Sequence, residues 1–306
     1  MIPLERIRAA AERARPHVLR SPVVPLDETT WLKLECLQPT GSFKVRGFFA
    51  RALQLPADQL ARGLITVSAG NAAQACAYVA QRLNVSCRVV MYETAPLAKI
   101  EGVRRWGAVP VLLPRDRVIG WLAGRGWEQE PETFIHPFAE PEVMAGHGGI
   151  ALELAEQVPD LKRVLVPTGG GGLVGGIASG LKQLLAEVEV IGVQSTGYPS
   201  WTTSLASGKP ETLTPETIAD GTTAPVDARN LELLREVVDR WIDVPEERLR
   251  PKIAELAQRA KVVAEGAGVL GFAALEDVQP GPATVAVVSG GNLSAELLAE
   301  ALSAGP

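Results

Sequence analysis

One lysine of this 306-residue chain, Lys44, follows a Gly41-Ser42 turn at the expected start of a helix. Turn and N-cap residues would hold its side chain at a fixed place on the first helical turn. Burial disfavours the ammonium form of a lysine, and the neutral amine that results can form a Schiff base with an aldehyde. Most lysines are surface charges, so this interpretation depends on three further stretches.

The second stretch is a run of glycines between an apolar strand and a helix. It comprises Gly169, Gly170, Gly171, Gly172 and Leu173. Consecutive backbone N–H groups at a helix start can bind a phosphate. A Walker A loop would end in Gly-Lys-Ser/Thr, which is absent, and an NAD site expects an acidic residue where Gln194 stands. We therefore expect a phosphate monoester, with a tight turn without ligand as the alternative.

The third stretch is another strand-to-helix junction, made of Ser68, Ala69, Gly70, Asn71 and Ala72. Its N–H groups and the Ser68 hydroxyl could bind a carboxylate, and the Asn71 amide could bond a ring hydroxyl. A serine hydrolase is excluded, because its GxSxG elbow would need glycine at Thr66. The three histidines His17, His136 and His147 lack the context of a catalytic base, so we interpret them as structural or surface residues.

The fourth stretch, Ser289-Gly290-Gly291-Asn292, ends an apolar strand. By itself it is only a tight turn. The Ser289 hydroxyl is a candidate neutral partner for a ring nitrogen, since a hydroxyl would not keep that nitrogen protonated as a carboxylate would.

Composition limits the classes of partner. The formal charge is −5, the pI is about 5.5, and no basic run is present, which argues against nucleic acid and anionic membrane surfaces and favours a small ligand. Three cysteines, Cys36, Cys76 and Cys87, have neither disulfide nor zinc spacing and favour a reducing cytoplasm. The N-terminal residues 1–15 resemble an amphipathic helix, and no apolar run reaches the roughly 18 residues of a membrane span.

Apolar strands alternate with helices along the whole chain, which is typical of α/β proteins with parallel sheets covered on both faces. We expect strands at 31–36, 64–67, 87–92, 109–113, 133–136, 163–166, 188–193 and 284–288. We expect helices at 72–83, 96–106, 141–157, 173–185, 231–240, 245–264 and 294–302. Residues 120–129 are predicted to form a loop or an irregular helix.

The four stretches, in this order and at these separations, resemble those of the fold type II pyridoxal-phosphate enzymes, and within them the threonine/serine dehydratase and serine racemase branch. Residues 35–44, His136-Pro137-Phe138, 215–221 and 265–268 extend the likeness. The resemblance implies an α/β fold similar to the tryptophan synthase β subunit, with the cofactor between two parallel-sheet domains. The large domain would comprise residues 1–50 and 136–306, and the small mobile domain residues 51–135, whose closure would exclude water.

The resemblance also implies a role for each stretch. Lys44 would form the Schiff base and act as the base at Cα, residues 169–173 would surround the phosphate, Asn71 would bond the ring hydroxyl, Ser289 would face the ring nitrogen, and residues 68–72 would bind the substrate carboxylate. A cytoplasmic homodimer is expected.

The expected reaction is α,β-elimination, in which an L-3-hydroxy amino acid of the threonine or serine class gives a 2-oxo acid and ammonia. With the neutral Ser289 at the ring nitrogen, the ring stabilises negative charge at Cα less well than it would beside an acid. Expulsion of the β-hydroxyl, which removes that charge, is therefore the expected next step. Threonine synthase or amino-acid racemase activity is an alternative, and a non-catalytic pyridoxal-phosphate carrier is another, disfavoured by the intact carboxylate loop.

Four positions depart from the relatives. Ala72 replaces the histidine of the dehydratases and Phe138 the asparagine of the racemases, so a bulkier or differently charged hydroxy amino acid is also a candidate substrate. Gln194 and Ser200 replace two metal-binding carboxylates, so we expect no tight Mg²⁺ or Ca²⁺ site. The chain ends soon after its last motif, so we expect no regulatory domain and no inhibition by isoleucine.

Overall fold

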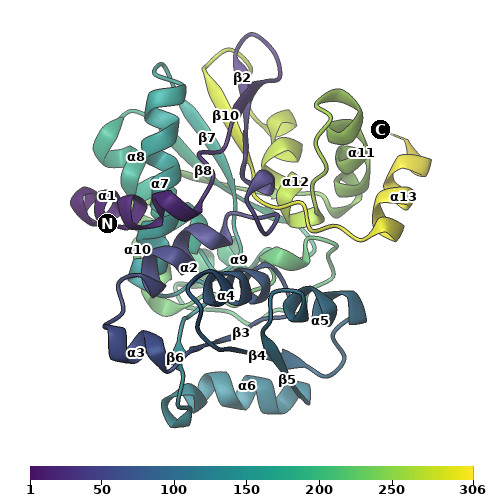
Figure 1. Cartoon of the computed structure of the whole chain (residues 1–306). Coiled ribbons are helices and arrows are strands. Elements are labelled where there is room, and N and C mark those ends of the chain that lie inside the picture. The colour runs from purple at the N-terminus through teal and green to yellow at the C-terminus, as the bar shows by residue number, and fades with distance from the viewer. Residues whose placement is uncertain (306) are drawn as a thin grey trace.

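Two parallel sheets form from the apolar strands in the computed structural model, which describes residues 1–305 (Figure 1). The larger sheet has the order β1-β2-β10-β7-β8-β9, and only its β1–β2 pair is antiparallel. Its strands are β1 Val23–Pro25, β2 Thr30–Leu34, β7 Arg163–Pro167, β8 Glu189–Ser195, β9 Arg240–Val244 and β10 Thr284–Val288. The smaller, all-parallel sheet has the order β5-β4-β3-β6, with β3 Leu64–Val67, β4 Cys87–Tyr92, β5 Val109–Leu113 and β6 Thr133–Phe134.

Helices cover both sheets. They are α1 Leu4–Ala14, α2 Lys44–Ala52, α3 Ala57–Ala61, α4 Asn71–Arg82, α5 Leu97–Arg104, α6 Arg115–Ala123, α7 Pro141–Gln157, α8 Gly172–Leu184, α9 Ser200–Ser207, α10 Ala228–Val237, α11 Leu249–Arg259, α12 Gly266–Ala273 and α13 Ala295–Ala304. Short 3₁₀ turns are η1 Arg15–His17, η2 Glu35–Leu37, η3 Gly126–Gln129, η4 Asp220–Thr222, η5 Glu246–Arg248 and η6 Ala274–Asp277. No helix within residues 1–305 is long and apolar enough to cross a membrane.

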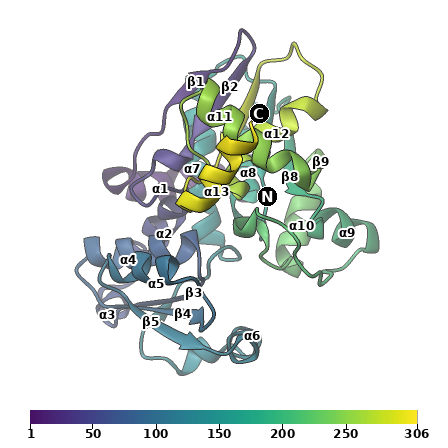
Figure 2. The same ribbon diagram turned by 90° about the vertical axis from the view of Figure 1, so that its right-hand side faces the viewer.

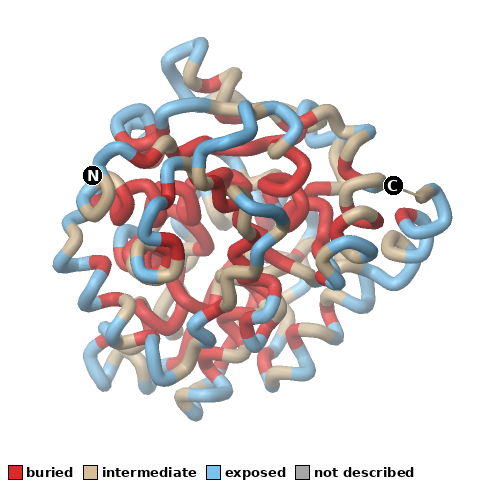
Figure 3. The backbone as a smooth tube through the Cα atoms, turned by 90° about the horizontal axis from the view of Figure 1, so that it is seen from above, coloured by how far each residue is buried: buried red, intermediate tan, exposed pale blue. Residues whose placement is uncertain are grey.

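The central strand β10 shows why these strands are apolar at every position. Val285 and Val287 face a core shared with α7, α8 and α10, whereas Ala286 and Val288 face a core shared with α11, α12 and α13. Alternate side chains of a strand point to opposite faces, so a sheet covered on both sides needs apolar residues throughout. Figure 3 shows the buried segments gathered inside the molecule and the exposed ones around its rim.

The smaller sheet is built in the same way, with α2, α4 and α5 against one face and α6 against the other. Figure 2 shows it with α3 to α6 as a lobe below the larger sheet. Every strand of the smaller sheet falls inside the residues 51–135 that we predict as the small domain. Those domain boundaries remain a prediction.

Two predicted segments differ from the structure, and a third, residues 120–129, has the irregular helical form that we predict. The single helix expected at 245–264 is instead η5 and α11, which ends at Arg259 before Lys261 adopts a left-handed φ of 59°. The helix expected at 231–240 is α10, capped by Asp227, and β9 follows it at once. Residues 120–129 contain the end of α6 and η3, separated by Arg125 at a φ of 54°. Short breaks at left-handed residues carry little sequence signal outside glycine and asparagine.

Candidate active site

Backbone hydrogen bonds join the lysine stretch to the end of β10. The Phe43 N–H donates to the Ser289 carbonyl at 3.1 Å, the Gly291 N–H donates to the Gly41 carbonyl at 2.9 Å, and Ser42 pairs with Gly290 in an isolated β-bridge. The structure therefore brings together two of the four predicted stretches, although about 250 residues of chain separate them.

Lys44 is the first residue of α2 and its side chain is partly buried. Its Nζ donates to the Pro137 carbonyl at 2.8 Å. Burial lowers the pKa of Lys44 to about 8, so about a tenth of the amine is neutral at pH 7, far more than for an ordinary lysine. The neutral amine is the nucleophilic form that Schiff-base chemistry requires.

The predicted N-cap role of Ser42 is wrong. The N-cap position of α2 is Phe43, no side chain caps the helix, and the buried Ser42 Oγ has no hydrogen-bond partner within residues 1–305. The reason is tertiary, because the pairing of Ser42 with Gly290 fixes its backbone in a bridge and not in a cap. A buried polar atom usually has a partner, so the Ser42 hydroxyl, two residues before Lys44, is free to bond a bound group or water.

The glycine loop has the form of an anion site. Within the described residues, the backbone N–H groups from Gly169 to Val174 donate no hydrogen bond. The carbonyls are held elsewhere, since Trp201 Nε1 donates to the Gly169 oxygen at 2.5 Å and Asn230 Nδ2 to the Gly170 oxygen at 2.7 Å. Free N–H groups at the start of α8, where the helix dipole is positive, suit a phosphate.

Two glycines of this loop are required by space and conformation. A Cβ at Gly170 would lie 2.3 Å from the Phe138 ring. Gly171 has a φ of 88°, which side-chain-bearing residues rarely adopt. The sequence alone did not point to Trp201 or Asn230, since neither lies in a motif and both act on the loop through long-range contacts.

Asn71, the first residue of α4, bridges to the larger sheet. Its Nδ2 donates to Glu265 Oε1 at 2.5 Å, and its Oδ1 accepts from Asn292 Nδ2 at 2.7 Å. These bonds bring the third stretch to the end of β10. Burial raises the pKa of Glu265 to about 7, although the hydrogen bond from Asn71 lowers it. Glu265 therefore holds a proton at slightly acidic pH, which an ordinary glutamate does not.

This shifted pKa predicts a pH-dependent stability in the cofactor-free protein. The unfolded chain releases the Glu265 proton near pH 4.5 and the folded chain near pH 7. The stabilisation from the protonated Glu265 is therefore fully present below about pH 4.5 and is lost as pH rises to about 7. We expect the free energy of unfolding of wild type, minus that of Glu265→Gln, to fall across this window in urea titrations. A difference independent of pH would contradict the assignment.

The remaining predicted residues lie around this cluster. The Ser68 Oγ accepts from the Gly70 N–H at 3.0 Å, and a Cβ at Gly70 would meet no atom within 4 Å, so the loop is open on that side. Ala72 is buried in the core. Ser289 is buried, and its hydroxyl donates to the Ala267 carbonyl at 3.5 Å.

An ion pair also connects the two halves of the molecule. Lys99 on α5, which covers the smaller sheet, pairs with Asp220 in η4, which belongs to the half with the larger sheet.

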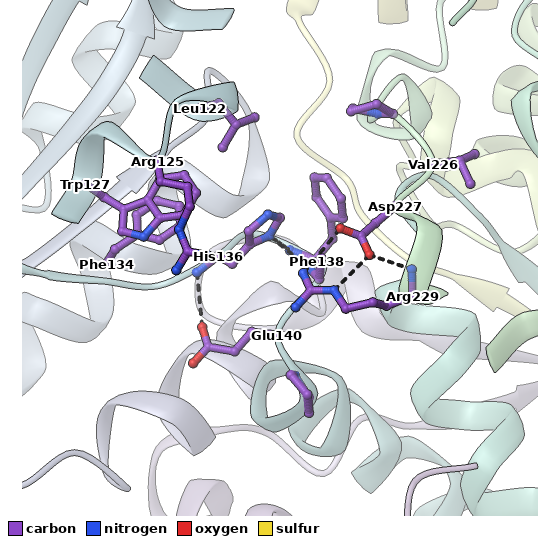
Figure 4. A pocket seen from close by; sticks show the side chains of 13 residues that line it. Leu122, Arg125, Trp127, Phe134, His136, Phe138, Glu140, Val226, Asp227 and Arg229 are labelled. Atoms are coloured by element: carbon purple, nitrogen blue, oxygen red, sulfur yellow. Dashed lines mark hydrogen bonds and ion pairs between the residues drawn. The ribbon is translucent and has the colours of Figure 1, made fainter. Parts of the chain in front are cut away.

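A groove of about 600 Å³ adjoins the site (Figure 4). Its lining is Leu122, Arg125, Trp127, Phe134, His136, Phe138, Ala139, Glu140, Pro141, Pro225, Val226, Asp227 and Arg229. Neither Lys44 nor the glycine loop lines it, but Phe138 does, and its ring also lies against Gly170. The groove therefore lies next to the predicted site of Lys44 and the glycine loop and does not contain it.

Gln194 and Ser200, the two residues at which we expect no metal to bind, form a hydrogen bond with each other. Gln194 Nε2 donates to Ser200 Oγ at 3.0 Å, and Gln194 Oε1 accepts from the Trp201 N–H at 2.8 Å. Both side chains are buried. That this position binds no cation remains a prediction.

Comparison with known proteins places the chain in a family. A family model described as pyridoxal-phosphate dependent enzyme matches residues 14–290. The L-threonine ammonia-lyase of Thermotoga maritima is 39% identical over 319 aligned residues, covering 100% of this chain and 79% of that protein. Maize serine racemase superposes with a TM-score of 0.91 at 29% identity, covering 98% of this chain and 97% of the other.

The T.th. threonine deaminase superposes with a TM-score of 0.86 at 36% identity, and 95% of this chain and 98% of that one are covered. These findings confirm the fold class, the cofactor family and the dehydratase-like branch that the four stretches predict. The chain belongs to the pyridoxal-phosphate dependent enzymes of fold type II, in the branch that contains the threonine ammonia-lyases and serine racemases.

Proposed function

We propose that this protein is a dehydratase that converts an L-3-hydroxy amino acid of the threonine or serine class to a 2-oxo acid and ammonia. The proposal is supported by a chain of contacts in a protein that is similar over its whole length to L-threonine ammonia-lyases. The turn before Lys44 and Asn71 both bond to the loop after β10, and the segment of Pro137 and Phe138 lies against both Lys44 and the glycine loop. Pyridoxal phosphate supplies the aldehyde and an electron-withdrawing ring for charge at Cα.

The residues present fit this cofactor. The free N–H groups of Gly169, Gly170, Gly171, Gly172 and Leu173 would hold its phosphate. Asn71 would bond the ring hydroxyl and the buried Ser289 would face the ring nitrogen. Lys44 would hold the aldehyde carbon, with a pKa low enough for its amine to act as a nucleophile.

The chain's own groups then divide the reaction between them. The open loop of Ser68, Ala69, Gly70, Asn71 and Ala72 would bind the substrate carboxylate and fix Cα. The Lys44 amine would be free to take the Cα proton once the substrate amine has replaced it at the aldehyde carbon. The β-hydroxyl would leave as water together with one proton, which balances the proton removed from Cα. The enamino acid tautomerises and takes up water, so the net products are one 2-oxo acid and one ammonia.

The decisive test is to incubate the purified protein with a panel of 3-hydroxy amino acids and to follow 2-oxo acid and ammonia together. Equal amounts of both products are expected. Release of phosphate from phosphohomoserine without ammonia would favour threonine synthase activity instead. A protein that binds the cofactor and turns over none of the panel would favour the non-catalytic carrier.

We also predict little racemisation, because it needs a proton donor on the face of Cα opposite Lys44. In the carboxylate loop the candidate position is Ala69, which has no proton to give. Wild-type protein should form oxo acid from L-serine or L-threonine with little D isomer, and Ala69→Ser should gain D isomer. Chiral chromatography measures both. D isomer formed by wild type as fast as oxo acid would contradict the assignment of Ala69.

The cellular setting is part of the proposal. We infer a cytoplasmic homodimer from the likeness to the family and from three buried free cysteines, Cys36, Cys76 and Cys87. We infer a large domain of residues 1–50 and 136–306 and a small mobile domain of residues 51–135. Light scattering coupled to size-exclusion chromatography tests the oligomeric state, and limited proteolysis with and without substrate tests the mobility.

A further inference from the structure

The segment 136–140 connects β6 of the smaller sheet to α7 and touches both halves of the site. The Pro137 carbonyl accepts from Lys44 Nζ at 2.8 Å. On the next residue, the Phe138 ring occupies the space beside Gly170 of the glycine loop. The conformation of three consecutive residues therefore sets the surroundings of the lysine and of the phosphate loop together.

His136 contacts this segment through one ring atom. Its Nδ1 accepts the N–H of Phe138 at 3.3 Å and that of Ala139 at 3.0 Å, while Pro137, between His136 and Phe138, has no N–H to offer. An acceptor must carry a lone pair, so this imidazole is neutral, with its proton on Nε2. Burial lowers the pKa of His136 to about 4, which keeps the lone pair available at neutral pH.

A second anchor ties the segment to α2, the helix that begins with Lys44. The His136 N–H donates to Glu140 Oε2 at 3.2 Å, and the Glu140 carboxylate pairs with Arg51 in the last turn of α2. Segment 136–140 is thus fastened to both ends of this helix, at Lys44 and at Arg51. Figure 4 shows His136 between Glu140 and Phe138 at the wall of the groove.

We propose that His136 is a positioning residue whose Nδ1 holds the turn at residues 137–139, so that the Pro137 carbonyl stays on the Lys44 amine and the Phe138 ring stays against Gly170. The inference rests on the proposed function of Lys44. The competing explanation is that His136 only fills space, because its ring packs edge-to-face against Phe134 at 5.8 Å and Phe138 at 4.7 Å between centroids.

Two substitutions separate the two explanations. His136→Asn removes the ring and keeps an acceptor one bond from Cγ, where Nδ1 lies, whereas His136→Phe keeps the ring and removes the acceptor. We expect His136→Asn to keep kcat within about threefold of wild type and His136→Phe to lose about 10- to 100-fold in kcat, since misplacement of a reacting group by an ångström has effects of this size. His136→Gln, whose acceptor lies further out, should behave like the phenylalanine variant.

A readout other than activity is the pH titration of the holoenzyme's visible absorption band. If the Pro137 carbonyl no longer accepts from the Lys44 nitrogen, the protonated form of that nitrogen is less stable. The midpoint of the band's pH titration should therefore move to lower pH in His136→Phe and His136→Gln, and stay unchanged in His136→Asn. The inference is overturned if the phenylalanine variant behaves like wild type, or if the asparagine variant is the more impaired one. Should His136→Phe not fold, His136→Gln decides alone.

The failure of this inference is distinguishable from failure of the proposed function. If wild type shows no visible band that depends on Lys44, the assignment of the lysine is wrong and the inference falls with it. If wild type shows the band and none of the three variants changes its midpoint or kcat, only the role of His136 is wrong.

Discussion

Lys44→Ala is expected to remove the visible absorption band of the purified protein and to lower lyase activity by about 10³-fold or more, the scale on which loss of a covalent nucleophile acts. The alanine has no amine to bond the cofactor aldehyde or to take the Cα proton. Absorption spectra and single-turnover formation of 2-oxo acid measure the two effects separately.

Lys162→Ala is the matched control, because this lysine is exposed in the loop just before β7 and belongs to none of the four stretches. It should keep the band and the activity of wild type. Unfolding midpoints of all three proteins show whether Lys44→Ala is folded. A folded Lys44→Ala protein with an unchanged band would show that another amine holds the cofactor.

Gly170→Ala should have the second largest effect. The added Cβ would lie 2.3 Å from the Phe138 ring, closer than carbon atoms approach without movement, so either the ring or the loop must shift. We expect the affinity for pyridoxal phosphate to fall by about tenfold or more, since a shifted loop no longer directs its N–H groups to one point. Fluorescence titration of cofactor-free protein measures this affinity.

The control for this substitution is Gly120→Ala in α6. Gly120 is exposed, and a Cβ there would meet no atom within 4 Å. Alanine is also the better helix former at an interior helical position, so stability should not fall. Equal cofactor affinity in Gly170→Ala and Gly120→Ala would mean that the loop tolerates a side chain and does not bind the phosphate closely.

The parts of the site that the sequence predicts are those with a local signal. The turn before Lys44 and the four glycines at the start of α8 have constraints that lie within a few residues of chain. Their place in the fold follows from the alternation of apolar strands and helices, since loops after parallel strands meet at the same edge of a sheet.

The residues that sequence analysis did not assign act over long separations. Trp201 and Asn230 hold carbonyls of the glycine loop, and Glu265 holds Asn71 across 194 positions. No local pattern distinguishes Trp201 or Asn230 from other residues of their types. The stretch 265–268 extends the family likeness, but it does not indicate that Glu265 bonds to Asn71. Ser42 illustrates the opposite error, because its local preference for a helix cap is overridden by pairing with Gly290.

The strand order has a consequence for how the chain folds as it is synthesised. β10 lies between β2 and β7, so the larger sheet cannot close until residues 284–288 have left the ribosome. The smaller sheet uses only residues 64–134 and can assemble much earlier. During most of translation β2 therefore lacks its neighbour β10. A nascent chain stalled before Thr284 would expose the apolar edges of β2 and β7 to aggregation or chaperone binding.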